Sequence, residues 1–179
     1  MASQRAMDEA STLDELRDWL LELQRLIQRQ TRRALQEQTS EQLALVANES
    51  ASDTIYQIDR GLDRLIVEQC EQLAERHAFL LVAEGLTQTF PAGTAREQAT
   101  FWLVMDPLDG TRGLMYDKRS AWSLAGVAWN RGPNPTLSDI VLAVQTEIPT
   151  TKHFLADTLW AASDGGVQAI RCNLLTGEE

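Results

Sequence analysis

The chain has 179 residues, with a formal net charge of -10 and an apolar fraction of 44%. This length is enough for one domain with a sizeable core, and the acidic charge argues against a nucleic-acid polymer as a partner. The sequence has no apolar run of membrane-spanning length, no signal-peptide core, and two cysteines, too few for a disulfide framework. We therefore expect a cytoplasmic protein with a flexible tail over residues 1–10 and a single domain over 11–179.

Two amphipathic helices are expected in the first half of the chain. Leucine and isoleucine recur at spacings of three and four from residue 13 to 27, which predicts a helix from about 11 to 38. A similar pattern predicts a second helix from Ile58 to Leu73, with Asp59 near its N-terminus, where an aspartate commonly caps a helix. The polar residues between the helices, 39–54, are expected to form a loop or a short strand.

The rest of the chain has the composition of β-strands. Two apolar runs end in carboxylates: Phe79–Ala83 precedes Glu84, and Phe101–Met105 precedes Asp106. The segment between them, 86–100, is expected to be a polar loop. Further strands are predicted at 121–129, 140–147, 151–156, 159–163 and 166–173. Short consecutive strands predict a mainly antiparallel sheet, and two helices packed on one face of it give an α+β fold.

The sequence Asp106-Pro-Leu-Asp-Gly-Thr111 immediately follows the second apolar run. Its proline cannot donate to a strand ladder, so we expect the strand to leave the sheet here. Its two aspartates, Asp106 and Asp109, supply the hard oxygen ligands that Mg²⁺ prefers. Gly110 allows close approach of the backbone, and Thr111 adds a hydroxyl. The chemistry indicated is a metal ion together with a phosphate group.

Other sites with similar residues do not fit this spacing. A calcium EF-hand loop has acidic residues at alternate positions, where this chain has Pro107 and Leu108. A haloacid-dehalogenase phosphatase would need an aspartate at position 107, and a P-loop would need a lysine after its glycine. The remaining alternative is an ordinary Asp-Gly turn after a strand.

The hexapeptide Asp106–Thr111 resembles the signature of the inositol monophosphatase superfamily, and its extension through Trp122 is similar to a bacterial branch. These are lithium-sensitive, magnesium-dependent phosphomonoesterases, and they include fructose-1,6-bisphosphatases and nucleotide 3′-phosphatases. The resemblance covers about residues 11–179 and corresponds to the N-terminal part of the family's αβαβα sandwich. It implies a small phosphorylated substrate, two or more Mg²⁺ ions and inhibition by lithium.

The resemblance also implies roles for individual residues. The metal ligands would be Glu84, Asp106, the Leu108 carbonyl and Asp109. Water would be activated by Glu84, Asp59 and Thr111. The substrate phosphate would be bound by Asp109, Gly110 and Thr111. The sequence departs from the family at Tyr56, which stands where a threonine usually precedes the aspartate by three residues.

Full-length relatives continue into a second α/β domain with a Trp-Asp-x-Ala-Ala-Gly motif, whose aspartate binds metal and substrate. This sequence has no such motif before Glu179. We expect the face left by that domain to be apolar and to favour a homodimer or another association. The leading hypothesis is hydrolysis of an inositol phosphate, a sugar phosphate or a nucleotide 3′-phosphate. The alternatives are a catalytically impaired fragment or pseudoenzyme that binds metal or self-associates, and a binder of inositol phosphates that does not hydrolyse them.

Overall fold

The computed structural model describes residues 2–39, 46–49, 54–84, 86–132, 134–163 and 165–179. Its helices are α1 (Ala2–Glu37), α3 (Gln57–Ala74) and α4 (Thr111–Met115), with single 3₁₀ turns η1 (Arg96–Gln98) and η2 (Leu137–Asp139). Its strands are β1 (Val46–Glu49), β2 (Thr54–Tyr56), β3 (Phe79–Ala83), β4 (Leu86–Phe90), β5 (Phe101–Asp109), β6 (Ala121–Trp129), β7 (Ile140–Ile148), β8 (Leu155–Ala162) and β9 (Val167–Asn173).

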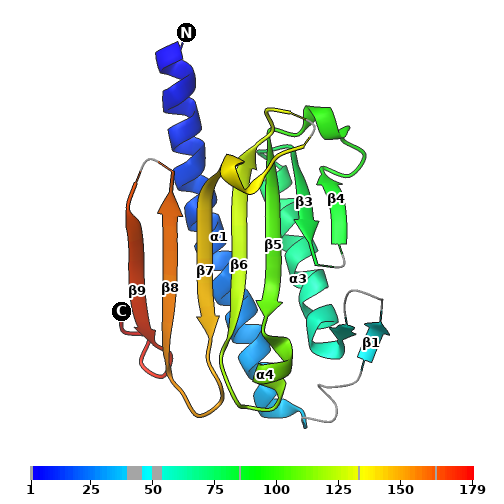
Figure 1. The fold of residues 1–179 in the computed structure, drawn as a ribbon, viewed down its shortest axis with the longest axis vertical. Helices are drawn as coiled ribbons and strands as arrows, with labels where there is room; N and C mark the ends of the chain where they lie inside the picture. Colours follow the sequence, from blue (N-terminus) through cyan, green and yellow to red (C-terminus); the bar gives the residue numbers. More distant parts are fainter. Residues whose placement is uncertain (1, 40–45, 50–53, 85, 133, 164) are drawn as a thin grey trace.

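One seven-stranded sheet organises the chain (Figure 1), in the order β4-β3-β5-β6-β7-β8-β9. Only β3 and β5 pair in parallel within it, and the other neighbouring strands are antiparallel. β1 and β2 form a separate antiparallel pair. The prediction of a mainly antiparallel sheet is confirmed.

The two long helices pack on one face of this sheet, as Figure 1 shows. The apolar stripe of α1 is fully buried, and so is the corresponding face of α3; the buried residues include Leu16, Leu20, Leu23, Ile27, Leu62, Ile66 and Leu73. On the sheet, Phe79 and Phe101 are also fully buried and stack with their ring centroids 5.2 Å apart. Burial of this stripe, at about 25 cal/mol per Å² of apolar surface, is what holds the helices to the sheet. The predicted α+β layer is therefore confirmed.

The first helix begins earlier than the sequence pattern predicts. α1 starts at Ala2 rather than near residue 11, because residues 2–10 contain good helix formers and neither glycine nor proline. Residue 12 therefore lies in the helix interior, where the Thr12 hydroxyl donates to the Asp8 carbonyl at 2.9 Å. The flexible tail over 1–10 and the domain over 11–179 stay predictions.

Three strand predictions need correction. The predicted loop over 86–100 contains β4, whose five residues pair with β3 in an antiparallel register from Phe79–Phe90 to Ala83–Leu86. The two strands expected at 151–156 and 159–163 are a single strand, β8. The strand before the motif does not end at Met105: β5 continues to Asp109 through a bulge, and its pairing with β6 resumes there.

Candidate functional site

The carboxylates predicted as metal ligands lie at or near the C-terminal ends of two neighbouring strands, β3 and β5. β3 and β5 are parallel, and Ala83 is paired with Met105. The next residues along the two strands, Glu84 and Asp106, therefore lie at the same edge of the sheet. Glu84 and Asp109 are exposed, whereas Asp106 is half-buried. This edge collects the acidic groups that the sequence singled out after β3 and within β5.

The turn around Pro107 is fixed by two hydrogen bonds within the motif. The Leu108 N–H donates to Asp106 Oδ1 at 3.1 Å, and the Thr111 hydroxyl donates to the Leu108 carbonyl at 2.6 Å. The ladder with β6 is interrupted between Asp106 and Asp109, where the proline has no N–H to contribute. The bulge therefore fixes the spacing of the two aspartates and directs the Leu108 carbonyl towards Thr111.

Gly110 is needed for its backbone conformation. Its φ is +93°, in the left-handed region that residues with a Cβ rarely adopt. A Cβ there would lie 3.5 Å from Ala121 Cα, an ordinary contact, so space alone would admit alanine. The left-handed turn leads from β5 directly into α4, whose N–H groups at Gly113 and Leu114 donate to the Gly110 carbonyl at 3.0 and 3.2 Å.

The structure brings some of the predicted site residues together and leaves others undecided. Asp106, Leu108 and Thr111 share the hydrogen bonds of the turn. Asp59 lies in the first turn of α3, as predicted, but its side chain is outside the described part of the chain. The pairing of Asp59 with Thr111 therefore stays a prediction.

The donor atoms at the site are of the type that Mg²⁺ prefers. Glu84, Asp106, Asp109 and the Leu108 carbonyl offer only oxygen atoms, and a carbonyl has a second lone pair beyond the one that Thr111 uses. Within the ranges that the structure describes, no group of three or more His, Cys, Asp or Glu side chains is close enough to hold a metal ion. Mg²⁺ sites commonly use one or two carboxylates together with water and phosphate oxygens, and the residues present fit that kind of site.

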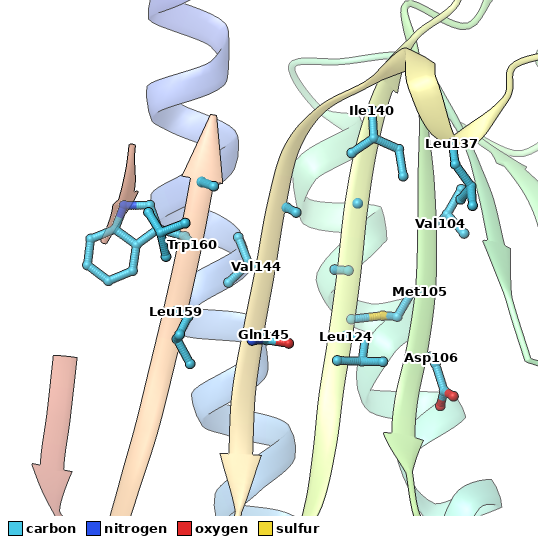
Figure 2. A pocket seen from close by; sticks show the side chains of 15 residues that line it. Val104, Met105, Asp106, Leu124, Leu137, Ile140, Val144, Gln145, Leu159 and Trp160 are labelled. Carbon is cyan, nitrogen blue, oxygen red and sulfur yellow. The ribbon is translucent and has the colours of Figure 1, made fainter. Parts of the chain in front are cut away.

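The site borders a broad apolar hollow on the sheet face opposite the helices (Figure 2), with a volume of about 600 Å³. Its lining includes Val104, Leu124, Ala143 and Leu159, and Asp106 lies at one end. Large apolar side chains are exposed around it: Val104 by 40%, Val167 by 70% and Leu137 by 85%. This surface is therefore apolar and open, and its assignment as the face left by a second domain stays a prediction.

Comparison with protein families identifies residues 13–125 as an inositol monophosphatase family domain. This region contains both long apolar stripes, Glu84 and the whole turn from Asp106 to Thr111. Since the match spans more than half of the sequence, the chain belongs to the inositol monophosphatase family. A search of curated protein sequences gave no match.

Solved structures share the fold. Fructose-1,6-bisphosphatase from Leishmania major in its holo form is 18% identical, with a TM-score of 0.66 over 91% of this chain and 51% of that one. The extragenic suppressor protein suhB from Bartonella henselae is 15% identical, with a TM-score of 0.60 over 88% and 54%. An IMPase from Thermotoga maritima is 17% identical, with a TM-score of 0.54 over 88% and 51%. This chain thus spans about half the length of these structures.

Sequence reasoning missed the long-range hydrogen bonds that join α1, the segment after α4 and the β7–β8 connection. Asp117 follows α4 and accepts hydrogen bonds from Thr151, and Arg32 of α1 donates to the connection between β7 and β8 that contains Thr151. These partners are separated by 34 residues or by more than 100. No local pattern in the sequence could have indicated them.

Proposed function

We propose that this chain takes part in Mg²⁺-dependent hydrolysis of a phosphomonoester by a water molecule. The observation that carries the proposal is the turn from Asp106 to Thr111, with its bulge and left-handed glycine, at the sheet edge that also holds Glu84. Family membership supports the same reaction, since members typically use Mg²⁺. In the reaction, the water oxygen forms a bond to phosphorus, the P–O bond to the alcohol breaks, and the alcohol oxygen takes up a proton, so that the products are the free alcohol and inorganic phosphate.

Each site residue has a role in this proposal. Glu84, Asp106, Asp109 and the Leu108 carbonyl would hold the Mg²⁺ ions, which when bound make a water acidic and neutralise phosphoryl charge. Glu84, Asp59 and Thr111 would orient the attacking water, and a carboxylate, Glu84 or Asp59, would take up its proton. Asp109 and the N–H groups of Gly110 and Thr111 would position the phosphate.

Local charge supports a phosphorylated substrate. The chain has a net charge of -10, yet residues 112–119 carry three cations, at Arg112, Lys118 and Arg119, and only one acid, Asp117. This basic segment directly follows the turn that would bind phosphate. A small phosphate ester would therefore meet positive charge beside the site in an otherwise acidic protein. Inositol phosphates, sugar phosphates and nucleotide 3′-phosphates are the substrates we propose.

A cytoplasmic location belongs to the same proposal. Cys70 and Cys172 are both free thiols, which suits a reducing compartment. Among the helices of the described residues, none is long and apolar enough to cross a membrane.

A second function is favoured by two specific observations. Within the described residues, no group of three His, Cys, Asp or Glu side chains could hold a metal ion, and the sheet face beside the turn is apolar and exposed. We therefore carry, as the alternative, a chain that binds metal with little or no turnover and associates through the apolar hollow, with itself or with another polypeptide. Size-exclusion chromatography with light scattering, comparing the wild type with Val104→Lys, tests the association, because a charge at this 40% exposed position would break it.

The test of the leading proposal is phosphate release from a panel of phosphomonoesters. The wild-type chain is measured with and without Mg²⁺, with added lithium, and beside Asp106→Asn and Asp139→Asn. Asp139 is a matched control, because its carboxylate accepts two hydrogen bonds from Thr136 at the opposite end of the sheet. We expect Mg²⁺-dependent, lithium-inhibited release that Asp106→Asn abolishes and Asp139→Asn leaves intact. Mg²⁺ binding without any release would instead select the alternative.

A further inference from the structure

A row of polar side chains on α1 forms hydrogen bonds to β7 and to the connection that follows it. Gln24, Gln28 and Arg32 are spaced four residues apart and so lie on one face of the helix. Gln24 Nε2 donates to the Val144 carbonyl at 3.1 Å, and Gln28 Nε2 donates to the Glu147 carbonyl at 2.6 Å. These bonds fix the end of β7 to the helix layer.

Arg32 continues this row into the β7–β8 connection. Its Nη1 donates to three backbone carbonyls, those of Pro149, Thr150 and His153, each at 3.1 Å. Thr150 is buried, and its hydroxyl lies 3.0 Å from His153 Nδ1. The connection between β7 and β8 is therefore attached to α1 by hydrogen bonds.

The same loop holds the carboxylate of Asp117. Asp117 Oδ1 accepts a hydrogen bond from the Thr151 N–H at 2.8 Å, and Oδ2 accepts one from the Thr151 hydroxyl at 2.9 Å. Lys152 Nζ lies 3.3 Å from Oδ2. Partial burial would raise the pKa of Asp117, but the bonds from Thr151 and Lys152 outweigh it and hold that pKa below its usual value. The carboxylate is thus ionised and fully engaged by the loop.

Asp117 is in turn joined to α4 and, through it, to Gly110. Its own N–H donates to the Leu114 carbonyl at 2.8 Å, and its φ of +51° closes the end of the helix. The N–H groups of Gly113 and Leu114 donate to the Gly110 carbonyl. A helix of five residues is too short to be stable alone, so its position depends on such outside contacts.

We propose that Asp117 is a positioning residue for the candidate site, latching α4 and the Gly110–Thr111 turn to the β7–β8 loop. The latch connects the turn to α1 through the β7–β8 loop, to which Arg32 donates, at the end of the sheet where Figure 1 shows α4 below β5. The positioning role rests on the proposed function, whereas the mechanical contact does not. Without the carboxylate, the short helix and the turn before it would shift relative to Asp106.

Two substitutions at Asp117 distinguish the effect of its carboxylate from the effect of its backbone conformation. Asp117→Gly removes the latch and adds no strain, because glycine adopts a φ of +51° freely. Asp117→Asn is the conservative variant, since asparagine tolerates the left-handed region and keeps one acceptor for the Thr151 N–H. Asp139→Asn is the matched control, because Asp139 Oδ2 accepts from the Thr136 N–H at 2.7 Å and from its hydroxyl at 2.9 Å.

The first readout is amide hydrogen exchange at Gly113 and Leu114, which needs no enzyme activity. We expect Asp117→Gly to speed exchange at both amides about tenfold, the effect of losing roughly one hydrogen bond's worth of stabilisation. Asp117→Asn should fall between Asp117→Gly and the wild type, and Asp139→Asn should match the wild type. Unchanged exchange in Asp117→Gly would overturn the latch, whatever the chain's activity.

The second readout is Mg²⁺ affinity by calorimetry, with kcat and KM measured separately where turnover is present. We expect about tenfold weaker Mg²⁺ binding in Asp117→Gly, with partial rescue in Asp117→Asn, by analogy with other groups that support metal ligands. Faster exchange with wild-type Mg²⁺ affinity and turnover would overturn the positioning role. A wild-type chain that binds no Mg²⁺ would refute the proposed function itself, and the exchange data would still decide whether the latch exists.

Discussion

The glycine of the Asp-Gly-Thr turn gives the sharpest stability prediction. Gly110 has a φ of +93°, and a Cβ at that position would lie no closer than 3.5 Å to any atom of the surrounding chain. Replacing it with alanine therefore adds no steric clash and costs only the left-handed backbone, roughly 1–2 kcal/mol. Alanine also lowers the conformational entropy of the unfolded chain, which offsets part of this cost, so we expect the free energy of unfolding to fall by about 1 kcal/mol.

Urea unfolding followed by tryptophan fluorescence measures this loss. With a typical slope of about 2 kcal/mol per M, the midpoint should fall by about 0.5 M. Gly93→Ala is the matched control, because Gly93 has a φ of +85°, follows β4 at the other end of the sheet, and has open space within 4 Å of where a Cβ would lie. Both variants should lose similar stability, but only Gly110→Ala should weaken Mg²⁺ binding. An unchanged midpoint for Gly110→Ala would refute the reasoning about its backbone.

Three further predictions follow from individual contacts. The hydrogen bond from His77 lowers the pKa of Glu15, and burial opposes this with a smaller effect. The ionised carboxylate therefore stabilises the fold above about pH 4.3, and this stabilisation is lost as the pH falls. The urea midpoints at pH 7 and pH 3.5 should differ less for Glu15→Gln than for the wild type, and equal differences would contradict this prediction. Burial raises the pKa of the Cys70 thiol to about 12. Alkylation at pH 8 should therefore label only Cys172 in the native chain and both thiols in urea. Two labels on the native chain in mass spectrometry would contradict the burial of Cys70. Thr111→Val removes the hydroxyl that donates to the Leu108 carbonyl and should lower the rate of phosphate release at least about tenfold. Thr111→Ser keeps the hydroxyl and should restore the rate. Equal rates for the two variants would exclude a role for that hydroxyl.

Most of the fold could be predicted because its elements are marked by local periodicity. The stripe of α1 and the strands β6, β7 and β9 follow patterns that a few neighbouring residues specify. β4 was missed because Leu86–Phe90 has only two apolar residues, and its strand structure comes from pairing with β3. The single strand β8 was predicted as two because polar residues at 157 and 158 interrupt its apolar character, although both lie in the ladder with β9.

The candidate site was predictable where its residues leave a local signature in the sequence. The turn from Asp106 to Thr111 lies within six residues, and its proline, glycine and threonine each leave a local signature. The latch from Asp117 to Thr151 could not be predicted, because a carboxylate 34 residues from its partner has no periodicity to mark it. The same holds for Arg32, whose three acceptors lie more than 100 residues away.

Every proposed role of the turn from Asp106 to Thr111 depends on its binding Mg²⁺. Isothermal titration of the wild-type chain with MgCl₂, beside Asp106→Asn and Asp139→Asn, tests it without requiring a substrate. We predict saturable binding by the wild type and by Asp139→Asn, with binding lost in Asp106→Asn, whose side chain is neutral and so a weaker metal ligand. Equal binding by all three chains, or no binding by the wild type, would contradict the assignment of this turn as the metal site.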